Sequence, residues 1–309
     1  MPVSTSIHIS HCLTQILALQ PRSVLDIGCG FGLWGFLCRE YLDVFSERVQ
    51  PADWQVKITG VELFDPYIMA HQRSLYNRIE IGDIRDLAAR LEPHELVIAG
   101  DVIEHLDKPD AQIVLRQLYD KAERAMLVNI PIGSGWEHGV VHDNPGELHR
   151  SEWHIRDFDE FLPQIQLFGL PCGAYGSFYC EKNHPDEHRV NIAMLLASRA
   201  ADGRDFETAF ANLRVAHRLA PGNEVVCLDL ANLLLERHEL QEAVNVLRAS
   251  VSANPAFHEG YLNLARLLAA LQRKDEARQY AEPLLTLPGV SSKIREDAIN
   301  LLTQLRGNG

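Results

Sequence analysis

The stretch VLDIGCGFGLWG, residues 24–35, decides how the first half of this chain folds. Apolar, β-branched residues lead into Asp26 and then into a run of alternating glycines, in the order D-x-G-x-G-x-G. These glycines are Gly28, Gly30 and Gly32. Glycines at this spacing let a strand turn tightly into a helix while the backbone approaches a ligand without Cβ clashes. The stretch therefore predicts a buried strand, a ligand-binding turn and a helix over about 31–42.

The residues around this turn alternate between strand-like and helix-like patterns. Further apolar, β-branched runs occupy residues 57–63, 79–83, 95–101 and 125–131. Helical spacing of apolar residues, as at 113–125, lies between them. This alternation predicts a parallel sheet with helices on both faces. The runs 172–180 and 189–198 follow one another without a helix, so we expect them to form an antiparallel pair at the end of the sheet.

The charged groups near the glycines suit a ligand with an amino-acid end. Amides at the start of the helix can meet a carboxylate, and Asp26 can take an ammonium group directly or through water. Glu62 ends the second predicted strand, where its carboxylate can accept both hydroxyls of a ribose. A dinucleotide fingerprint would need glycine where Leu33 stands, so the pattern argues against NAD.

The D-x-G-x-G-x-G pattern resembles motif I of the class I S-adenosylmethionine (SAM)-dependent methyltransferases. The resemblance implies an α/β fold with a Rossmann-like, seven-stranded sheet over residues 1–199, and SAM as the cofactor. It also implies that Asp83, after the third strand, meets the adenine amino group with Ile84 beside the ring. The expected cofactor-binding residues are Asp26, Gly28, Cys29, Gly30, Gly32, Glu62, Leu63, Asp83, Ile84 and Asp101.

The segment after the fourth strand carries the candidate catalytic residues. Its DVIEHL core, residues 101–106, resembles a segment common in small-molecule and sugar O-methyltransferases. Asp101, Glu104 and His105 have the spacing i, i+3, i+4, which places them on one face if a helix starts there. With His149, which follows the fifth strand, Asp101 and His105 are the candidate catalytic groups.

A second resemblance suggests a metal at this place. Small-RNA 3′-terminal 2′-O-methyltransferases carry E-x-x-E-H here and a later H-x-x-E-W, and the four side chains hold a divalent metal. By that resemblance Asp101, Glu104, His105 and His149 are candidate ligands of Mg or Mn, although Asp101 is shorter than the glutamate it replaces. Such a metal would lower the pKa of an acceptor hydroxyl. The alternatives are that His149 is a metal-free general base, or that Glu104 and His105 brace the start of a helix.

The connection over residues 129–158 is long for a link between a strand and a helix. Long loops at this edge of a sheet commonly cover the acceptor, and residues 143–158 resemble the lid of uncharacterised bacterial methyltransferases. The remaining histidines of the connection are predicted to have surface or core roles; they are His138, His142 and His154.

From about residue 200 the strand pattern ends and an internal repeat begins. Residues 203–221 align with 237–255 at a shift of 34, and a third copy starts near Gln272. A helix–turn–helix period of this length resembles the tetratricopeptide repeat. We expect an all-α domain over 200–309 with about two and a half units, the first without its own first helix, and a capping helix over 292–305. Its predicted concave side carries Asp229, Asn232, Asn263 and Arg266.

Composition bounds the class of protein. The 309-residue chain is 46% hydrophobic and has a formal net charge of −13, which argues against nucleic-acid binding. No run is apolar enough for a membrane span and the N-terminus lacks a secretory pattern. The six cysteines form no C-x-x-C pair. We therefore expect a cytoplasmic protein with reduced cysteines.

These observations predict an enzyme that methylates a hydroxyl of a sugar, polyol or natural-product scaffold. Oxygen is favoured over nitrogen because Gly100-Asp101-Val102 stands where an N-P-P-Y-like motif would lie. One alternative is a protein or precursor-peptide methyltransferase whose repeats recruit the substrate; the repeats could equally self-associate. A second alternative is a repeat adaptor without catalysis. RNA ribose methylation is disfavoured by the acidic balance.

Overall fold

The computed structural model describes residues 5–136, 143–182 and 186–307, which form two compact units. The first unit is Met1–His184 and the second is Pro185–Gly309. The division falls earlier in the chain than residue 199, where the sequence pattern placed it. The reason lies in helix α6, which belongs to the second unit.

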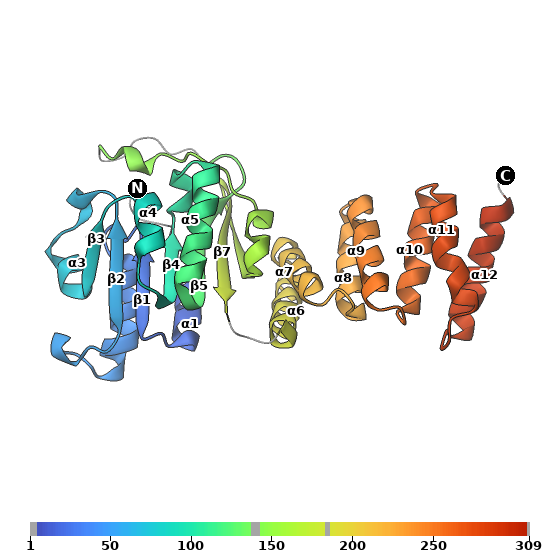
Figure 1. Cartoon of the computed structure of the whole chain (residues 1–309), viewed down its shortest axis with the longest axis horizontal. Helices are drawn as coiled ribbons and strands as arrows, with labels where there is room; N and C mark the ends of the chain where they lie inside the picture. Colours follow the sequence, from blue (N-terminus) through green and yellow to red (C-terminus); the bar gives the residue numbers. More distant parts are fainter. Residues whose placement is uncertain (1–4, 137–142, 183–185, 308–309) are drawn as a thin grey trace. The chain divides into compact units, whose positions relative to one another are not determined.

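The first unit is built on a seven-stranded mixed sheet with the order β3-β2-β1-β4-β5-β7-β6 (Figure 1). The strands are β1 (Ser23–Ile27), β2 (Lys57–Glu62), β3 (Arg78–Ile81), β4 (His94–Gly100), β5 (Ala122–Ile132), β6 (Gln164–Leu170) and β7 (Gly173–Glu181). The first five pair with one another in parallel, and β7 pairs antiparallel with both β5 and β6. This order is typical of the methyltransferase Rossmann-like fold, so the predicted fold class is confirmed.

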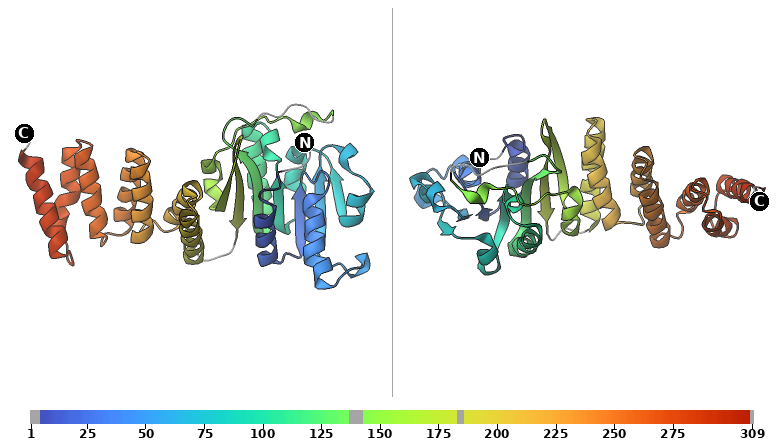
Figure 2. Two further views of the ribbon diagram at one scale, coloured as in Figure 1. Left: turned by 180° about the vertical axis from the view of Figure 1, so that it is seen from behind. Right: turned by 90° about the horizontal axis from the view of Figure 1, so that it is seen from above.

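Helices cover both faces of this sheet (Figures 1 and 2). They are α1 (Ile9–Leu19), α2 (Leu33–Cys38), α3 (Ala70–Leu75), α4 (Ile84–Leu87) and α5 (Lys108–Lys121). On one face, α1 and α2 bury Ile16 and Trp34 against alternate strand residues such as Ile58 and Ile98. Among the helices of the described residues, none combines the length and apolar character that crossing a membrane requires.

The antiparallel end of the sheet differs from the prediction. The hairpin is formed by β6 and β7, whereas residues 189–198, predicted as a strand, lie within the helix α6 (Asp186–Asp202). The buried residues Val190, Ala193 and Ala197 have helical rather than alternating spacing. The missed strand β6 alternates half-buried residues with the buried Ile165 and Leu167.

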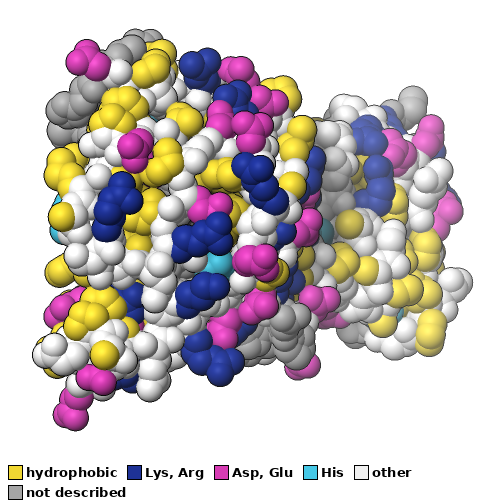
Figure 3. Space-filling view, turned by 60° about the vertical axis from the view of Figure 1, so that its left-hand side comes forward, with side chains coloured by type: hydrophobic (Ala, Val, Ile, Leu, Met, Phe, Trp, Pro, Cys, Tyr) yellow, Lys and Arg dark blue, Asp and Glu magenta, His cyan; other side chains and the backbone are white. Residues whose placement is uncertain are grey.

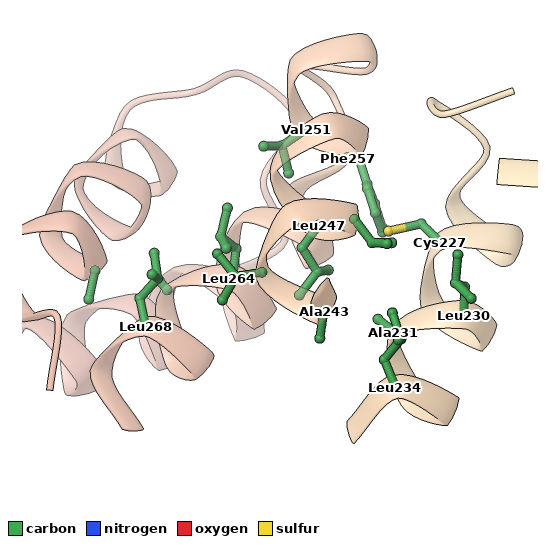
Figure 4. Packing of buried hydrophobic residues seen from close by; sticks show 14 of the residues in the cluster. Cys227, Leu230, Ala231, Leu234, Ala243, Leu247, Val251, Phe257, Leu264 and Leu268 are labelled. Atoms are coloured by element: carbon green, nitrogen blue, oxygen red, sulfur yellow. The ribbon is translucent and has the colours of Figure 1, made fainter. Parts of the chain in front are cut away.

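The second unit consists of paired helices that follow the 34-residue period. They are α6, α7 (Phe206–Leu219), α8 (Glu224–Glu236), α9 (Leu240–Ala253), α10 (His258–Ala270), α11 (Lys274–Ala281) and α12 (Ser292–Gly307). Figure 4 shows Cys227 of α8 and Leu247 of α9 pointing toward Phe257, just before α10. Ala243 and Ala277, at equivalent positions, are fully buried, as the close approach of the helices requires. The prediction that the first repeat lacks its first helix is wrong, because α6 takes that place.

The repeat also recurs in the ion pairs between the second helices of neighbouring repeats. Arg214 of α7 pairs with Glu242 of α9 at 3.2 Å, and Arg248 of α9 pairs with Glu276 of α11 at 2.9 Å. Because both partners recur after 34 residues, the sequence period is also a period of contacts. Such half-exposed pairs contribute little stability singly and mainly fix the register of the helices.

Candidate functional site

A cavity of about 580 Å³ lies where the carboxyl ends of the parallel strands meet. It is lined by all of the predicted cofactor-binding residues except Asp26 and Gly32. This edge is where open α/β sheets bind ligands, because the helices that follow the strands start there. The topology therefore brings together residues that are far apart in sequence, such as Gly28, Glu62 and Asp101.

The glycine turn forms one wall of the cavity and has no room for side chains. Gly28 has a φ of +66°, and a Cβ there would lie 2.4 Å from Cγ2 of Val102. Gly30 and Gly32 also have positive φ, of 46° and 84°. Glycine is the residue that adopts this backbone without strain, so the turn is shaped as a backbone cradle, as the sequence predicted.

Asp26 lies behind this turn and does not reach the cavity wall. Its carboxylate is buried, and Oδ2 accepts a 2.5 Å hydrogen bond from the hydroxyl of Tyr76. Oδ1 has no hydrogen-bond partner among the described residues. Burial raises the pKa of Asp26 to about 7. Because the carboxylate lies behind the wall, an ammonium group in the cavity would reach Oδ1 through a water.

Tyr76 is a site residue that sequence reasoning missed. Its hydroxyl accepts a 3.1 Å hydrogen bond from the Gly35 amide as well as donating to Asp26. The ring lies so close to α2 that a Cβ at Gly35 would be 2.1 Å from its Cζ atom. A glycine inside a helix can mark such a close approach, and Gly35 was the one signal in the sequence.

Glu62 is held at the cavity wall by the backbone. Its Oε2 accepts a 2.9 Å bond from the Gly30 amide, and its Oε1 accepts a 2.9 Å bond from the Phe64 amide. Burial nevertheless raises its pKa. Gln72, also missed from the sequence, donates from Nε2 to the carbonyls of Gly30 and Tyr67 and braces the same turn.

Asp83 lines the cavity but is already engaged by protein groups. It caps α4 by accepting a bond from the Arg85 amide, and its carboxylate pairs with the Arg85 guanidinium at 2.6 Å. These bonds to Arg85 lower the pKa of Asp83. Arg85 also reaches Asp110 at 3.5 Å.

On the side of the sheet where β3 forms the edge, basic side chains mingle with acidic ones rather than forming a basic patch (Figure 3).

The candidate catalytic residues do not share one helical face. Asp101 has a φ of +51° and precedes a short 3-10 turn, Ile103–His105. Its Oδ2 accepts a 2.8 Å bond from the Tyr175 hydroxyl. Glu104 is fully buried, and neither carboxylate oxygen has a hydrogen-bond partner among the described residues. Burial, reinforced by the nearby Asp101 charge, raises the pKa of Glu104 well above its usual value.

His105 and His149 meet beside Glu104. Their ring centroids are 5.0 Å apart, and one ligand atom from each of the three residues lies within 4.8 Å of the others. Nδ1 of His105 lies 3.2 Å from the Leu148 carbonyl, and Nδ1 of His149 lies 2.6 Å from the Trp136 carbonyl. A carbonyl only accepts, so Nδ1 is the donor in each of these contacts, and in a neutral ring Nε2 is then the acceptor nitrogen. Asp101 is outside this group of three.

A second cavity of about 510 Å³ adjoins the first. The two share Pro131, Trp136, His149 and Arg150 in their walls, and Glu104 lines the second. The group formed by Glu104, His105 and His149 therefore lies between the two cavities. Of the other predicted histidines, His154 is exposed, and His138 and His142 lie outside the described residues.

The residues predicted for the concave side of the repeats have different environments. Asp229 and Asn232 are exposed, and Asn263 is half-buried. Arg266 pairs with Asp297 of α12 at 3.0 Å. One of the predicted contact residues is thus engaged within its own unit.

Comparison with known proteins gives a family match for part of the second unit. Residues 200–256 match the family model of the tetratricopeptide repeat. By sequence, no curated protein matches the chain at a significant level. Among solved structures, the magnesium protoporphyrin IX methyltransferase of Synechocystis PCC 6803 with bound SAH is similar at 13% identity, with 57% of this chain and 82% of that chain covered and a TM-score of 0.41.

Two further structures are similar to one unit each. TehB of Haemophilus influenzae has 13% identity over 58% of this chain and 64% of its own, with a TM-score of 0.41. The second tetratricopeptide domain of human RPAP3, in complex with an HSP70 peptide, has 13% identity over 40% of this chain and 98% of its own, with a TM-score of 0.32. At these identities the likeness concerns the fold, and the reaction has to be argued from the residues themselves.

Proposed function

We propose that the first unit is a SAM-dependent methyltransferase whose acceptor atom is a hydroxyl oxygen of a sugar, polyol or natural-product scaffold. The observation that carries this proposal is the combination of a glycine cradle with two buried acids, Asp26 and Glu62, at one sheet edge. The cradle has room for a backbone-bound ligand, and Asp26 Oδ1 lacks a donor that an ammonium group would provide. An amino acid joined to a nucleoside fits this set of groups.

The acceptor side of the proposal rests on Glu104, His105 and His149. These residues fit a divalent cation such as Mn or Mg, because Glu104 is buried without a donor and the two imidazoles, each bonded through Nδ1, could ligate a cation through Nε2. When bound, the cation would lower the pKa of an acceptor hydroxyl. Asp101, whose Oδ2 accepts a hydrogen bond from Tyr175, is not one of the three candidate ligands. It would add a negative charge beside them.

His149 is the competing candidate for a general base without a metal. Its proton on Nδ1 is fixed by the Trp136 carbonyl, so Nε2 can accept the proton of a hydroxyl in the adjoining cavity. Methyl transfer otherwise needs the acceptor oxygen in line with the methyl group. The walls shared by the two cavities would provide that alignment.

Calorimetric titration of SAM and S-adenosylhomocysteine (SAH) tests the cofactor proposal. We expect micromolar binding that is lost in Asp26→Ala and retained in Glu160→Gln, a matched charge loss at an exposed ion pair with Arg116. Titration of MnCl₂, with His149→Ala beside the unaltered protein, separates the two acceptor mechanisms. A binding heat for Mn²⁺ in the unaltered protein that disappears in His149→Ala supports the cation. The absence of such a heat in the unaltered protein supports His149 as a general base. Failure of the unaltered protein to bind SAM or SAH would refute the proposal that the first unit is a SAM-dependent methyltransferase.

Recruitment of a peptide through the tetratricopeptide-like unit is the second proposal. The repeat match over 200–256 and the exposed Asp229 and Asn232 favour it, while the engagement of Arg266 by Asp297 reduces the surface available. SAH formation with hydroxylated small molecules and with peptide libraries distinguishes the two acceptor classes. The non-catalytic adaptor is the outcome to accept if neither class gives SAH and the cofactor does not bind.

A further inference from the structure

Residues 143–151, here termed the lid segment, run along the site from the Glu62 side to the group of His105 and His149. Figure 1 shows this green segment above the carboxyl ends of the parallel strands. Its first part contains the 3-10 turn Pro145–Glu147. Its last part is fixed to the 3-10 turn Ile103–His105, because the amides of Arg150 and Ser151 both donate to the Glu104 carbonyl, at 2.8 and 3.1 Å.

The first part of the lid segment is fixed to the cofactor side of the cavity. The Tyr67 hydroxyl, from the loop after β2, donates a 3.0 Å hydrogen bond to Oε1 of Glu147. Asn144 is buried, accepts a bond from the Gly146 amide at 2.9 Å and lies 3.4 Å from the same Oε1. A Cβ at Gly146 would lie 3.1 Å from Leu63 Cδ2, so the turn rests directly on the end of β2.

This arrangement places two carboxylates in one cavity wall. Glu62 and Glu147 both line the cavity, and the Glu147 charge adds to the burial that raises the pKa of Glu62. Like charges in a partly dry cavity are unfavourable unless donors or a cation come between them. A ribose offers two adjacent hydroxyls, each of which can donate one hydrogen bond.

We propose that Glu147 is a second cofactor-binding carboxylate, which accepts one ribose hydroxyl opposite Glu62 and thereby couples cofactor binding to the position of His149. The inference rests on the proposed binding of SAM in this cavity. The ligand class that Glu147 recognises is a nucleoside with an intact ribose diol. Tyr67 orients Glu147 and is a positioning residue.

The coupling follows from the length of the connection. His149 is two residues after Glu147, and the chain beyond it is fixed by the bonds to the Glu104 carbonyl. Because the chain beyond His149 is fixed, a movement of the Glu147 backbone toward a ribose would displace the backbone that carries His149. Cofactor binding therefore organises the group that receives the acceptor, and we expect the cofactor to bind before the acceptor.

A cycle that combines protein and ligand changes tests the ribose contact. Binding of SAH, 2′-deoxy-SAH and 3′-deoxy-SAH is measured by calorimetry for the unaltered protein, Glu147→Gln, Tyr67→Phe and the control Glu160→Gln. We expect Glu147→Gln to weaken SAH on the order of tenfold, the loss of one charge-assisted hydrogen bond, and to leave one of the two deoxy analogues unaffected. Tyr67→Phe should give a smaller loss of the same pattern.

The results that would overturn the inference are distinct from those that would overturn the proposed function. If the unaltered protein binds SAH and Glu147→Gln binds it equally well, the ribose contact is refuted alone. Equal weakening of SAH and both deoxy analogues also refutes it, because the effect then does not pass through a hydroxyl. No binding of SAH to any variant refutes the proposed function and the inference together.

The coupling to His149 has its own readout. The Cε1–H resonance of His149, assigned with His149→Gln, is followed by NMR at saturating SAH. It should shift on binding in the unaltered protein and in Glu160→Gln, and shift less in Glu147→Gln, although all are saturated. Equal shifts in all three proteins would show that the lid segment does not transmit cofactor binding.

Discussion

The hydrogen bond between Tyr76 and Asp26 makes a specific prediction about the pH dependence of cofactor binding. Asp26 must be ionised to attract an ammonium group, and burial raises its pKa to about 7. Affinity for SAM should therefore be nearly constant above this pKa and fall as pH drops through it. For one carboxylate with that pKa, the ionised fraction falls about 25-fold between pH 7.5 and 5.5. The dissociation constant should rise by the same factor.

Tyr76→Phe should move this profile to higher pH. The hydroxyl donates to Oδ2 of Asp26 at 2.5 Å and stabilises the ionised form. Loss of one such bond is worth about 1.5 kcal/mol, or one pKa unit. The variant should then bind SAM about tenfold more weakly at pH 5.5 and about threefold more weakly at pH 7.5.

Calorimetry from pH 5.5 to 7.5 stays below the usual α-amino pKa of about 7.7–8.0, so the amino group of SAM is mostly charged over the range in which these profiles differ. The matched control is Tyr41→Phe, a half-buried tyrosine on the π-helix turn after α2. A flat profile in the unaltered protein would show that Asp26 does not sense the ligand charge. A sloping profile that Tyr76→Phe leaves in place would show that Tyr76 does not set the Asp26 pKa.

Three further predictions concern stability. Asp26→Asn should make the protein about 1–3 kcal/mol more stable at pH 8, because a carboxylate whose pKa is raised by folding costs stability above that pKa. In urea unfolding this gain in stability should shrink as the pH falls below 7. A gain that stays constant with pH would contradict the raised pKa as its cause. Gly35→Ala should destabilise by about 1–3 kcal/mol, since its Cβ would lie 2.1 Å from Tyr76 Cζ; an unchanged melting curve would place the ring elsewhere. Leu264→Ala, fully buried in the second unit, should cost about 2–5 kcal/mol, against less than about 1 kcal/mol for the exposed Ile299→Ala, and similar losses would contradict the packing.

The sequence predicted most of the fold because its patterns are local. The strands that contain Asp26 and Glu62 have β-branched runs with glycine or acidic residues at or just after their ends, and the repeat period is visible without any structure. Residues 189–198 were assigned wrongly because a short apolar run suits a strand and a helix equally. Its real partner is α7, and that contact is made across a turn that the sequence pattern does not reveal.

The candidate site was predictable where a residue follows a strand and not where a side chain arrives from elsewhere. Gly28, Glu62 and Asp83 line the cavity because parallel strands end at one edge. Gln72 belongs to α3 and Tyr76 follows it directly. Both side chains reach the glycine turn through tertiary packing. Asp101 and Glu104 were placed on one helical face because the spacing allows it, but Asp101 has a positive φ and precedes a 3-10 turn, so the two carboxylates come near each other without a shared α-helix.

The burial of acids at this edge is itself an argument for ligands. Burial raises the pKa values of Asp26, Glu62 and Glu104, and each ionised form therefore destabilises the folded protein. A core selected for stability alone would replace them with apolar residues, which pack without desolvating a charge. All three lie beside the two adjoining cavities. Asp26 Oδ1 and both oxygens of Glu104 have no hydrogen-bond partner among the described residues, whereas Glu62 accepts bonds from two backbone amides. In the proposed reaction an ammonium group would pair with Asp26, ribose hydroxyls would donate hydrogen bonds to Glu62, and a cation would bind Glu104. The cost to stability is thus greatest where the proposed chemistry needs charge.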